Sequence, residues 1–567
     1  MPCPARAGHR VRCPAIGPDP GLDRRSLRGG QDQAHPGRLA SRSRPHPRDR
    51  RRNGRGRRRA RCIDAHVVAG AGAIAVSVED SQPVVLGLDL GTTEVKAGLI
   101  DLDGRLLGLA RSGYELDVTG GHGWAEQDPG AWWSAVVSAV RGLHLHGVGE
   151  VVAIGVDGHG PTLAAVDARG EATRPAITFL DARASEETAE LERTTGVRGW
   201  ALAGLPAALW VERHEPDTAD ATRWYLTTWE YLAFRLTGVA SGPLVPDQLV
   251  PDPGAVAAVG IPAAKLPPPS STGQIVGGLA DAAADALGLR PGIPVIGGTV
   301  DAFASYLGAG LLEPGDAFDP GGSAGGFGVY WDRPLDVPGG FVTPGPLAGR
   351  YSVGAAMAAT GRALDWYRDD VLGGTITTDA LLLEAAATPP GADGLVFLPY
   401  LAGERSPIWD PEARGVLAGL TLGHGRGHIA RAIVEASALA IRQVAAPMLA
   451  AGVRVTEMRV CGGPARSTFW NGVKADITGF SVAVPAVLET AVLGSAILAA
   501  VGIGAYRDLP EAIAAMTRIA TRIEPRAEFA ATYDRAFAAY QALYPATAPI
   551  LRPLTAPDPS SGIRAWR

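Results

Sequence analysis

A short loop of glycine and threonine, directly after a buried strand, is the feature that most restricts how this chain can fold. The segment "VVLGLDLGTTEVKAGLIDLDG", residues 84–104, begins with an apolar run bounded by glycine, which is typical of an interior strand. A second strand follows at once, and its hairpin turn falls at Asp103-Gly104. The tight turn at Gly91 directs backbone N–H groups and two hydroxyls into one small space beside Asp89. This arrangement suits a phosphate with its metal ion, and a strand with a polar hairpin turn has the same pattern.

The same outline occurs a second time along the chain. From residue 83, strands alternate with helices, which predicts an α/β architecture. Residues 316–331 again read as a strand, an acidic residue, a loop of glycine and hydroxyl, and another strand. We therefore expect two α/β halves that hold a polyphosphate between them. The Walker A spacing is absent and no GxGxxG follows the first strand, which disfavours a P-loop enzyme and a Rossmann dehydrogenase.

Length and charge limit the class of protein. A chain of 567 residues is too long for one core, and it predicts two domains of roughly 200–250 residues. Residues 1–62 carry 18 Arg and 4 Asp, a net charge of +14, so the rest of the chain carries −19 of the total of −5. An acidic body argues against a nucleic-acid-binding protein. The sequence contains no uninterrupted run of about 18 apolar residues, so we expect no transmembrane helix. Cys461 is alone in the body, which favours a reducing, cytoplasmic setting.

The first 75 residues differ in composition from the rest. The stretch "RSRPHPRDRRRNGRGRRRARC" has no apolar period and cannot bury a core, so we expect disorder there. Three interpretations compete: a basic arm for nucleic acid, a transit peptide, and translated upstream sequence with the natural start near Val76 or Val78. We favour the third, because arginine bias extends through the whole coding sequence. The only lysines are Lys96, Lys265 and Lys474.

Six motifs in a fixed order resemble the FGGY carbohydrate kinases, which belong to the superfamily of actin, sugar kinases and heat-shock ATPases. The resemblance covers about residues 84 to 545. Its most specific part is "GVLAGLTLGHGRGHIARAIVE", residues 415–435, which follows the family signature in full. The other five are "GLDLGTTEVKA", "GWAEQDPGAWW", "PAITFLDARA", "GGTVDAFAS" and "CGGPARSTFWNGVKADITG".

The resemblance implies an α/β protein of two ribonuclease H-like domains, of the actin-like ATPase type, with a cleft between them. It places a sugar-binding domain at residues 83–310, a nucleotide-binding domain at residues 311–545 and a tail at residues 546–567. It implies ATP-dependent phosphorylation, with Mg²⁺, of a hydroxyl on a small sugar or polyol, as in xylulose kinases. No nucleic-acid or membrane partner is expected, and dimers are common in the family. The alternative is a nucleotide-binding regulator of the same fold that has no turnover.

The resemblance also implies roles for individual residues. Asp301, at a strand end and helix start, is the expected base for the attacking hydroxyl, and its other interpretation is a cap for its helix. Asp89 is the expected magnesium site, through water. The expected nucleotide-binding residues are Thr92, Thr93, Lys96, Gly321, Gly322, Ser323, Gly361, Asp365, Gly463, Pro464 and Ser467. Gly322 replaces a threonine of the relatives, so we expect one hydroxyl contact to be lost.

The sugar itself is left open by the motifs. The expected substrate contacts are His159, Gly160, Phe179, Asp181 and Asp301. The segment "GVDGHGPT" lacks the Gln-Met-His of xylulose kinases and the Arg-Glu of glycerol kinases. Phe179 stands where relatives usually have Trp, Asp181 could bind a hydroxyl or support the pocket, and His159 could contact a hydroxyl or be structural.

Overall fold

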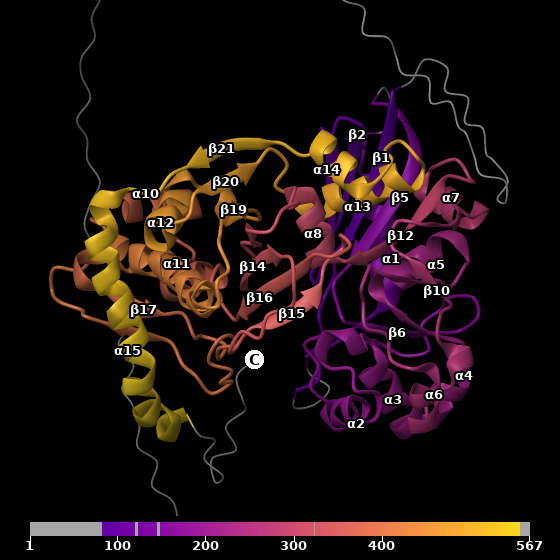
Figure 1. Ribbon diagram of the computed structural model, residues 1–567, viewed down its shortest axis with the longest axis horizontal. Helices are drawn as coiled ribbons and strands as arrows, with labels where there is room; N and C mark the ends of the chain where they lie inside the picture. Colours follow the sequence, from indigo (N-terminus) through magenta and orange to yellow (C-terminus); the bar gives the residue numbers. More distant parts are fainter. Residues whose placement is uncertain (1–81, 119–122, 145–147, 323, 556–567) are drawn as a thin grey trace, which may run out of the picture. The chain divides into compact units, whose positions relative to one another are not determined.

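The computed structural model of the chain describes residues 82–118, 123–144, 148–322 and 324–555 (Figure 1). The arginine-rich segment 1–75, Ser323 and the end of the expected tail lie outside these residues. Within them, one large mixed sheet organises each half of the chain.

The N-terminal sheet has six strands in the order β11-β12-β5-β1-β2-β3. Strand β1 pairs antiparallel with β2 and parallel with β5, and β5 pairs parallel with β12. The expected hairpin of β2 and β3 is confirmed, with its turn at residues 102–105. The strands are β1 Pro83–Leu90, β2 Glu94–Asp101, β3 Leu106–Gly113, β5 Glu150–Gly158, β11 Ile275–Gly278 and β12 Pro294–Val300.

Helices cover both faces of this sheet, which is why β1 is apolar on both sides. Val84 and Leu86 pack in one cluster with residues of α1 and α5, whereas Val85 packs in another with α8 and α13. Helix α1 begins after Asp128, its N-cap, whose side chain accepts from Gly130 N over 2.8 Å. The helices of this half that pack on the large sheet are α1 Pro129–Arg141, α5 Thr228–Thr237, α7 Asp281–Leu287 and α8 Asp301–Ala309.

A smaller sheet in the order β4-β7-β6-β8 extends the N-terminal half and carries the expected sugar-pocket segment. Its strands are β4 Glu126–Gln127, β6 Leu163–Val166, β7 Ala176–Ile177 and β8 Trp224–Thr227. The helices α2 Ser185–Thr195, α3 Leu205–His214, α4 Pro216–Ala221 and α6 Pro253–Val259 and the strand pair β9 Gly242–Leu244 and β10 Pro269–Ser271 complete this half.

The C-terminal sheet repeats the pairing pattern of the first one. Its order is β15-β16-β14-β13-β19-β20-β21, and β13 pairs antiparallel with β14 and parallel with β19. Strand β13 therefore has the same neighbours, in direction, as β1, which confirms the expectation of two similar α/β halves. The strands are β13 Asp316–Asp319, β14 Gly325–Trp331, β15 Phe341–Pro344, β16 Tyr351–Met357, β19 Glu457–Val460, β20 Val482–Pro485 and β21 Ile519–Ile523, with the separate pair β17 Val396–Leu398 and β18 Val416–Ala418.

Most of the C-terminal helices pack around a long central one, α11. The helices are α9 Arg362–Trp366, α10 Thr378–Ala387, α11 Arg426–Ala450, α12 Thr468–Thr478, α13 Thr490–Gly502, α14 Leu509–Met516 and α15 Ala530–Thr555. Helix α9 is followed directly by one π turn, Tyr367–Val371. Among the described residues only α11 is long and apolar enough to cross a membrane. The core helix of a globular protein meets the same criteria. In α11, 72% of the most apolar 18-residue window is buried inside the protein, as in such a core helix.

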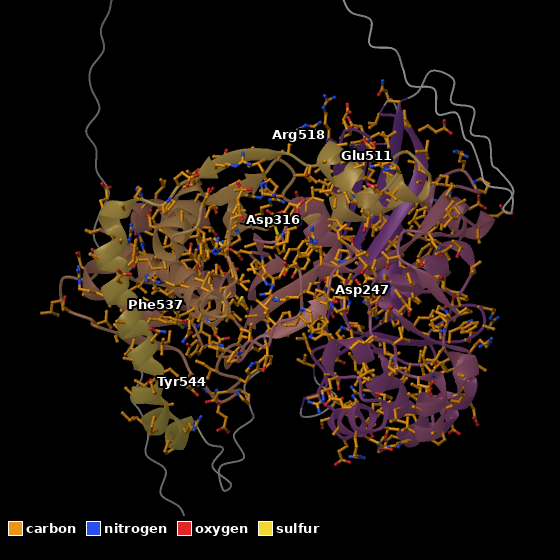
Figure 2. The ribbon with its side chains drawn as sticks, viewed as in Figure 1. Asp247, Asp316, Glu511, Arg518, Phe537 and Tyr544 are labelled. Carbon is orange, nitrogen blue, oxygen red and sulfur yellow. The ribbon has the colours of Figure 1, made fainter. Side chains whose placement is uncertain are left out.

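Glycines allow α13 to lie close to both α8 and the N-terminal sheet. A Cβ on Gly494 would lie 1.8 Å from Ala304 O of α8, and one on Gly155 of β5 would lie 1.9 Å from Ser495 O. Polar contacts also join the halves: Gly349 N donates to Asp247 Oδ2 over 2.9 Å, and Arg518 donates to a backbone carbonyl of the β2–β3 turn (Figure 2).

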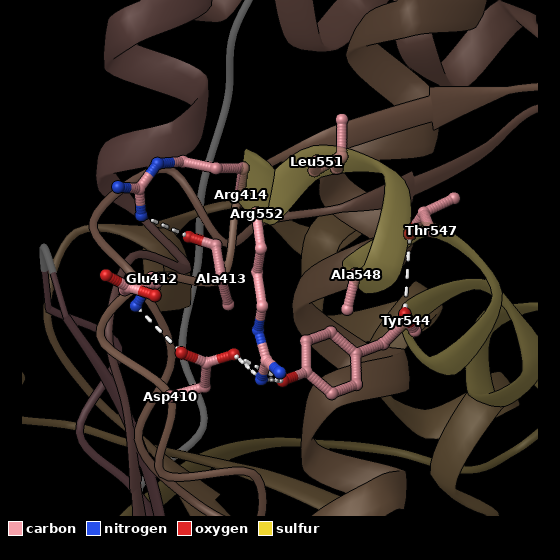
Figure 3. A pocket seen from close by; sticks show the side chains of 9 residues that line it. All are labelled: Asp410, Glu412, Ala413, Arg414, Tyr544, Thr547, Ala548, Leu551 and Arg552. Carbon is pink, nitrogen blue, oxygen red and sulfur yellow. Dashed lines mark hydrogen bonds and ion pairs between the residues drawn. The ribbon is translucent and has the colours of Figure 1, made fainter. Parts of the chain in front are cut away.

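Helix α15 continues ten residues past the boundary that we expected at residue 545. Its end is fastened to the loop after β17, where Asp410 Oδ2 accepts from Tyr544 Oη over 2.5 Å and from Arg552 over 2.7 Å (Figure 3). The hollow seen there contains none of the expected site residues.

Candidate active site

The first glycine loop, residues 91–93, follows β1. Side chains of the N-terminal half hold its conformation through hydrogen bonds to the loop carbonyls. Tyr114 Oη donates to Gly91 O, and Gln127 Nε2 donates to Thr92 O over 2.7 Å. Gln127 is held in turn by Trp132 Nε1, which donates to it over 3.2 Å. Because two loop carbonyls are already bonded, the loop is pre-organised to present its remaining N–H groups and threonine hydroxyls.

Asp89 and Lys96 form an ion pair beneath this loop. Lys96 Nζ donates to Asp89 Oδ2 over 2.8 Å, and the Asp89 side chain is 6% exposed. Burial alone would lower the pKa of Lys96, but attraction to Asp89 outweighs it, and the pKa is raised. Lys96 thus stays a cation. Its side chain is paired with Asp89 and mostly buried, so it is not simply a solvated side chain on the surface of β2.

Asp157 joins Asp89 at the strand ends, and the sequence reasoning missed it. The two residues are direct partners in the parallel pairing of β1 with β5, and Thr299 of β12 lies on the other side of Asp157. Asp157 is fully buried, with Oδ2 accepting from Ser495 Oγ over 2.5 Å and Oδ1 without a donor among the described residues. Burial and the charge of Asp89 raise its pKa well above the usual range. The available signal was a single carboxyl in the otherwise apolar run "VVAIGVDG".

Asp301 lies at the first position of α8, directly after β12. Burial, and then the charge of Asp89, raise the pKa of Asp301 to about 7, against a backbone N–H bond from Ala302 that lowers it. The N-cap of α8 is Val300, so Asp301 does not occupy the cap position itself. A carboxyl group with a pKa near 7 can take up a proton at neutral pH, which is what a base for a hydroxyl requires.

His159 is buried behind this group of carboxyls, among aromatic rings. Its ring centroid lies 5.6 Å from that of Trp132 and 5.9 Å from that of Phe179. Nδ1 is bonded to Thr162 Oγ1 at 3.0 Å, and Nε2 has no partner among the described residues. Burial lowers the pKa of His159 to about 4, so the ring is neutral at pH 7. Thr162 Oγ1 also accepts from Phe179 N; in the tautomer in which its own proton goes to Nδ1, Nε2 is a hydrogen-bond donor.

Gly160 and Asp181, the other expected sugar contacts, lie in different surroundings. A Cβ on Gly160 would lie 2.9 Å from the Trp229 ring, so this glycine lets the chain pass close to an aromatic wall. The Asp181 carboxylate is fully buried and accepts from Arg183 Nη2 and from Ala125 N, both over 2.6 Å. Arg183 stacks on Trp124 at 3.7 Å. Of the two roles left open for Asp181, these contacts favour support of the pocket wall.

The second glycine loop, after β13, borders a hollow in the C-terminal half that we call the β13 hollow. Three of the expected nucleotide residues line it: Gly321, Gly361 and Pro464. Asp319, Thr360, Trp470 and Lys474 line it as well and were not expected. Gly322 is exposed, and Ser323 lies outside the described residues.

The remaining expected nucleotide residues surround this hollow less directly. Gly463 is exposed in the turn that also holds Pro464, and Ser467 Oγ caps α12 by accepting from Trp470 N over 3.2 Å. Asp365 is exposed and pairs with Arg368 at 3.2 Å, outside the hollow.

The second glycine loop packs on the chain at Cys461, and the charges of both Lys96 and Lys474 act on the buried thiol of that residue. Burial raises the pKa of this thiol to about 12, while the charges of Lys474 and Lys96 both act to lower it. One lysine stands beneath each loop, so both loops lie within electrostatic reach of the same side chain. A polyphosphate that contacts both loops fits this arrangement.

A magnesium ion is implied by the family resemblance, and the residues present fit one held partly by substrate. No group of three or more His, Cys, Asp or Glu side chains in the described part of the chain could hold a metal alone. Asp89 Oδ1 is not engaged by Lys96, and Asp157 Oδ1 has no donor. Mg²⁺ is usually bound by one or two carboxylates together with substrate phosphates, and these two oxygens suit that role.

Comparison with known proteins adds an independent line of evidence. The model of the FGGY family of carbohydrate kinases, N-terminal domain, matches residues 84–308, and that of the C-terminal domain matches residues 325–503. Xylulose kinase of Escherichia coli is 31% identical over 416 residues, 70% of this chain and 84% of that protein. Glycerol kinase of Symbiobacterium thermophilum is 31% identical over 466 residues, 75% of this chain and 91% of that protein. The crystal structure of xylulose kinase from Rhodospirillum rubrum is 32% identical, with a TM-score of 0.68, and the match covers 82% of this chain and 99% of that one.

Proposed function

Because this chain belongs to the FGGY family of carbohydrate kinases, with ATP-dependent phosphorylation of a sugar as its activity, we propose that its substrate is a pentulose or a similar small polyol. The observation that carries the proposal is the position of Asp301, which follows β12 at the same sheet edge as Asp89 of β1, with β5 between the two strands, and which has a pKa near neutrality. The alternative, a regulator without turnover, finds no support among the relatives.

The proposed mechanism assigns proton transfer to Asp301. Phosphoryl transfer needs positioning, charge neutralisation and a base for the attacking hydroxyl, and little covalent chemistry from the protein. With a pKa of about 7, Asp301 is ionised in about half of the molecules at neutral pH and accepts the hydroxyl proton as the phosphoryl group moves. The proton then rests on a half-buried carboxyl group whose surroundings favour the neutral form.

Phosphate contacts are proposed to come from both glycine loops. Thr92, Thr93 and Lys96 would meet the terminal phosphates at the first loop, and Gly321 and Gly322 at the second. Mg²⁺, when bound, supplies charge neutralisation across the phosphate oxygens. Asp89 and Asp157 are the carboxyl groups proposed to hold it, and Lys96 orients Asp89 from the opposite oxygen.

The sugar is proposed to bind near His159. The Nε2–H of this neutral ring is a buried donor without a partner among the described residues, and a sugar hydroxyl would satisfy it. Phe179 and Trp229 supply apolar walls for a sugar face. Relatives named xylulose kinase and glycerol kinase have equal identity to this chain, so sequence identity does not select the sugar.

We further infer a cytoplasmic enzyme that binds neither nucleic acid nor membrane, and we propose a homodimer only by analogy with the family, in which dimers are common. The acidic body of the chain and the single free, buried cysteine of the described residues support the compartment and the absence of nucleic acid. Light scattering of the purified protein tests the dimer.

The test of the proposed function is ADP release by the full chain with Mg-ATP across pentuloses, tetritols, pentitols, hexuloses and glycerol. We expect one pentulose or polyol to respond clearly, and Asp301→Asn to remove that response. Silence across the whole panel, with ATP binding intact, would contradict the proposed substrate class.

A further inference from the structure

We propose that Lys474 is a positioning residue for the nucleotide: its ammonium group neutralises Asp319 beneath the second glycine loop, which lets a polyphosphate bind there. The inference rests on the proposed function, because it takes the β13 hollow as the nucleotide site. It concerns two residues that none of the expected motif roles includes.

Lys474 and Asp319 form a buried ion pair in the wall of the hollow. Lys474 Nζ donates to Asp319 Oδ2, and the two side chains are 3% and 4% exposed. They are the only charged residues among those that line the hollow in the described part of the chain. The pair therefore leaves the hollow without net charge, whereas either residue alone would give it a full charge at low dielectric.

Asp319 is needed in this place for the shape of the loop. Its Oδ1 accepts from Gly321 N over 2.9 Å. Gly321 has a φ of +57°, and a Cβ there would lie 2.1 Å from Cys461 O, so the loop packs directly on the chain after β19. The carboxylate thus holds the loop in a conformation that only glycine adopts without strain. Its negative charge, however, is of the wrong sign for a phosphate site.

Lys474 removes this conflict, and the first loop has the same arrangement. Asp89 is the penultimate residue of β1 and Asp319 is the last residue of β13, and Lys96 pairs with Asp89 at 2.8 Å. The two lysines come from unrelated elements, β2 and α12, yet each neutralises the carboxylate beneath its loop. A compact ammonium fits into this space, which a planar guanidinium would fill differently.

A purely structural ion pair and a nucleotide-positioning pair predict different effects. Loss of a purely structural pair would change the free energy of unfolding. If that loss also displaced the residues that line the hollow, it would weaken the binding of adenosine, ADP and ATP to the same extent. A positioning pair acts on phosphate charge, so its loss weakens ADP and ATP but not adenosine. The contrast between adenosine and ADP is therefore the decisive measurement.

The experiment is calorimetric titration of the full chain with adenosine, ADP and ATP. In Lys474→Met the Asp319 carboxylate faces the phosphates unpaired, and we expect the Kd for ADP to rise about tenfold or more, with adenosine changed less than about twofold. The double variant Asp319→Asn with Lys474→Met removes both charges and should recover most of the ADP affinity. The matched control is Lys265→Met, which breaks the part-buried Lys265–Glu212 pair at 2.8 Å in the other half and should leave the Kd for ADP unchanged.

Two results would overturn the inference. One is a folded Lys474→Met protein that binds ADP as the wild type does, and the other is an equal loss of affinity for adenosine and ADP. If Lys474→Met does not fold, Asp319→Asn gives the test, because Lys474 is then a cation without its counterion. ADP should bind about threefold more tightly with adenosine unchanged, and unchanged or weaker ADP binding would overturn the inference.

Failure of the proposed function gives a different result. A wild-type protein that binds ADP but phosphorylates no sugar would contradict the proposed function and leave the Lys474 inference standing. A wild-type protein that binds no ADP would overturn both. Normal sugar turnover with ADP binding insensitive to Lys474→Met would overturn this inference alone.

Discussion

Ser495 Oγ donates to Asp157 Oδ2 over 2.5 Å, so a residue of helix α13 in the C-terminal half holds a carboxyl group at the centre of the N-terminal sheet. The other carboxyl oxygen, Asp157 Oδ1, has no hydrogen-bond donor among the described residues, and the Asp89 carboxyl group lies next to it on β1. The pairing places a third carboxyl group beside Asp89 and Asp301, and it makes the carboxyl cluster dependent on contact between the halves.

Removing the Ser495 hydroxyl should therefore destabilise the protein. We expect Ser495→Ala to lower the free energy of unfolding by about 1–3 kcal/mol, because the buried Asp157 carboxyl loses its donor. Urea unfolding measures this change, and Ser134→Ala, which loses an exposed hydroxyl on α1, is the matched control with less than about 0.5 kcal/mol. In a double-mutant cycle with Asp157→Ala the two losses should not add. Full additivity would show that the bond contributes nothing.

Substitution of the proposed base should separate turnover from nucleotide binding. We expect Asp301→Asn to lower kcat by about 10²–10⁴-fold, since the amide cannot accept the hydroxyl proton, and to leave the Kd for ADP unchanged. Steady-state kinetics and calorimetry measure the two quantities. Asp252→Asn, at the N-cap of α6, is the matched control and should retain full turnover. Nearly intact turnover in Asp301→Asn would mean that another group is the base.

The raised pKa of Asp301 also predicts how activity and stability depend on pH. The base must be ionised, so kcat/KM should rise between pH 6 and pH 8 with an apparent pKa of about 7. The folded state binds this proton more tightly than the unfolded chain, so the contribution of Asp301 to stability decreases as pH rises from about 4 to 7. Asp301→Asn should then gain stability relative to wild type at pH 8 but not at pH 4. An equal difference at both pH values would contradict the assignment.

His159 should determine sugar affinity without responding to pH near neutrality. We expect His159→Leu to raise the KM for the sugar about tenfold and to leave ADP binding unchanged, because the Nε2–H donor is lost. With a folded pKa of about 4, the ring stays neutral from pH 5 to pH 8, so the sugar KM should show no step from this residue. The unfolded chain takes up the proton first, and stability should fall from about pH 6.5 to pH 4. A sugar KM unaffected by His159→Leu would assign the residue to the core.

The end of helix α15 should depend on Asp410. Bonds from Arg552 and Tyr544 lower the pKa of Asp410 to about 2, so their stabilisation is present above about pH 4 and is lost as pH falls towards 2. We expect Asp410→Asn to increase hydrogen exchange in the last turns of α15 while kinase turnover is retained. The matched control is Asp534→Asn, also on α15, which breaks an exposed ion pair with Arg442 of α11 at 2.6 Å. It should have little effect on that exchange. Unchanged exchange in Asp410→Asn would show that the apolar contacts of α15 hold its end.

Local patterns in the sequence predicted the elements that carry the site. Strand β1, the turn between β2 and β3 and the passage from β12 to Asp301 depend on neighbouring residues, and each is found in the structure. The family resemblance is likewise confirmed by the domain models. The expected roles of the individual site residues remain predictions, because they depend on ligands as well as on the fold.

Long-range pairing decided what the sequence could not. Asp157 reads as one polar residue in a strand until the register of β5 places it beside Asp89 and Ser495 bonds to it from 338 positions away. Lys474 reads as a helix residue until its ammonium reaches Asp319, 155 positions earlier in the chain. Sequence alone therefore determined the strands, the loops and the chemistry they can support, since those follow from local backbone preference and apolar periodicity. The tertiary structure decided which charges neutralise one another, because that depends on the distances between side chains brought together by folding.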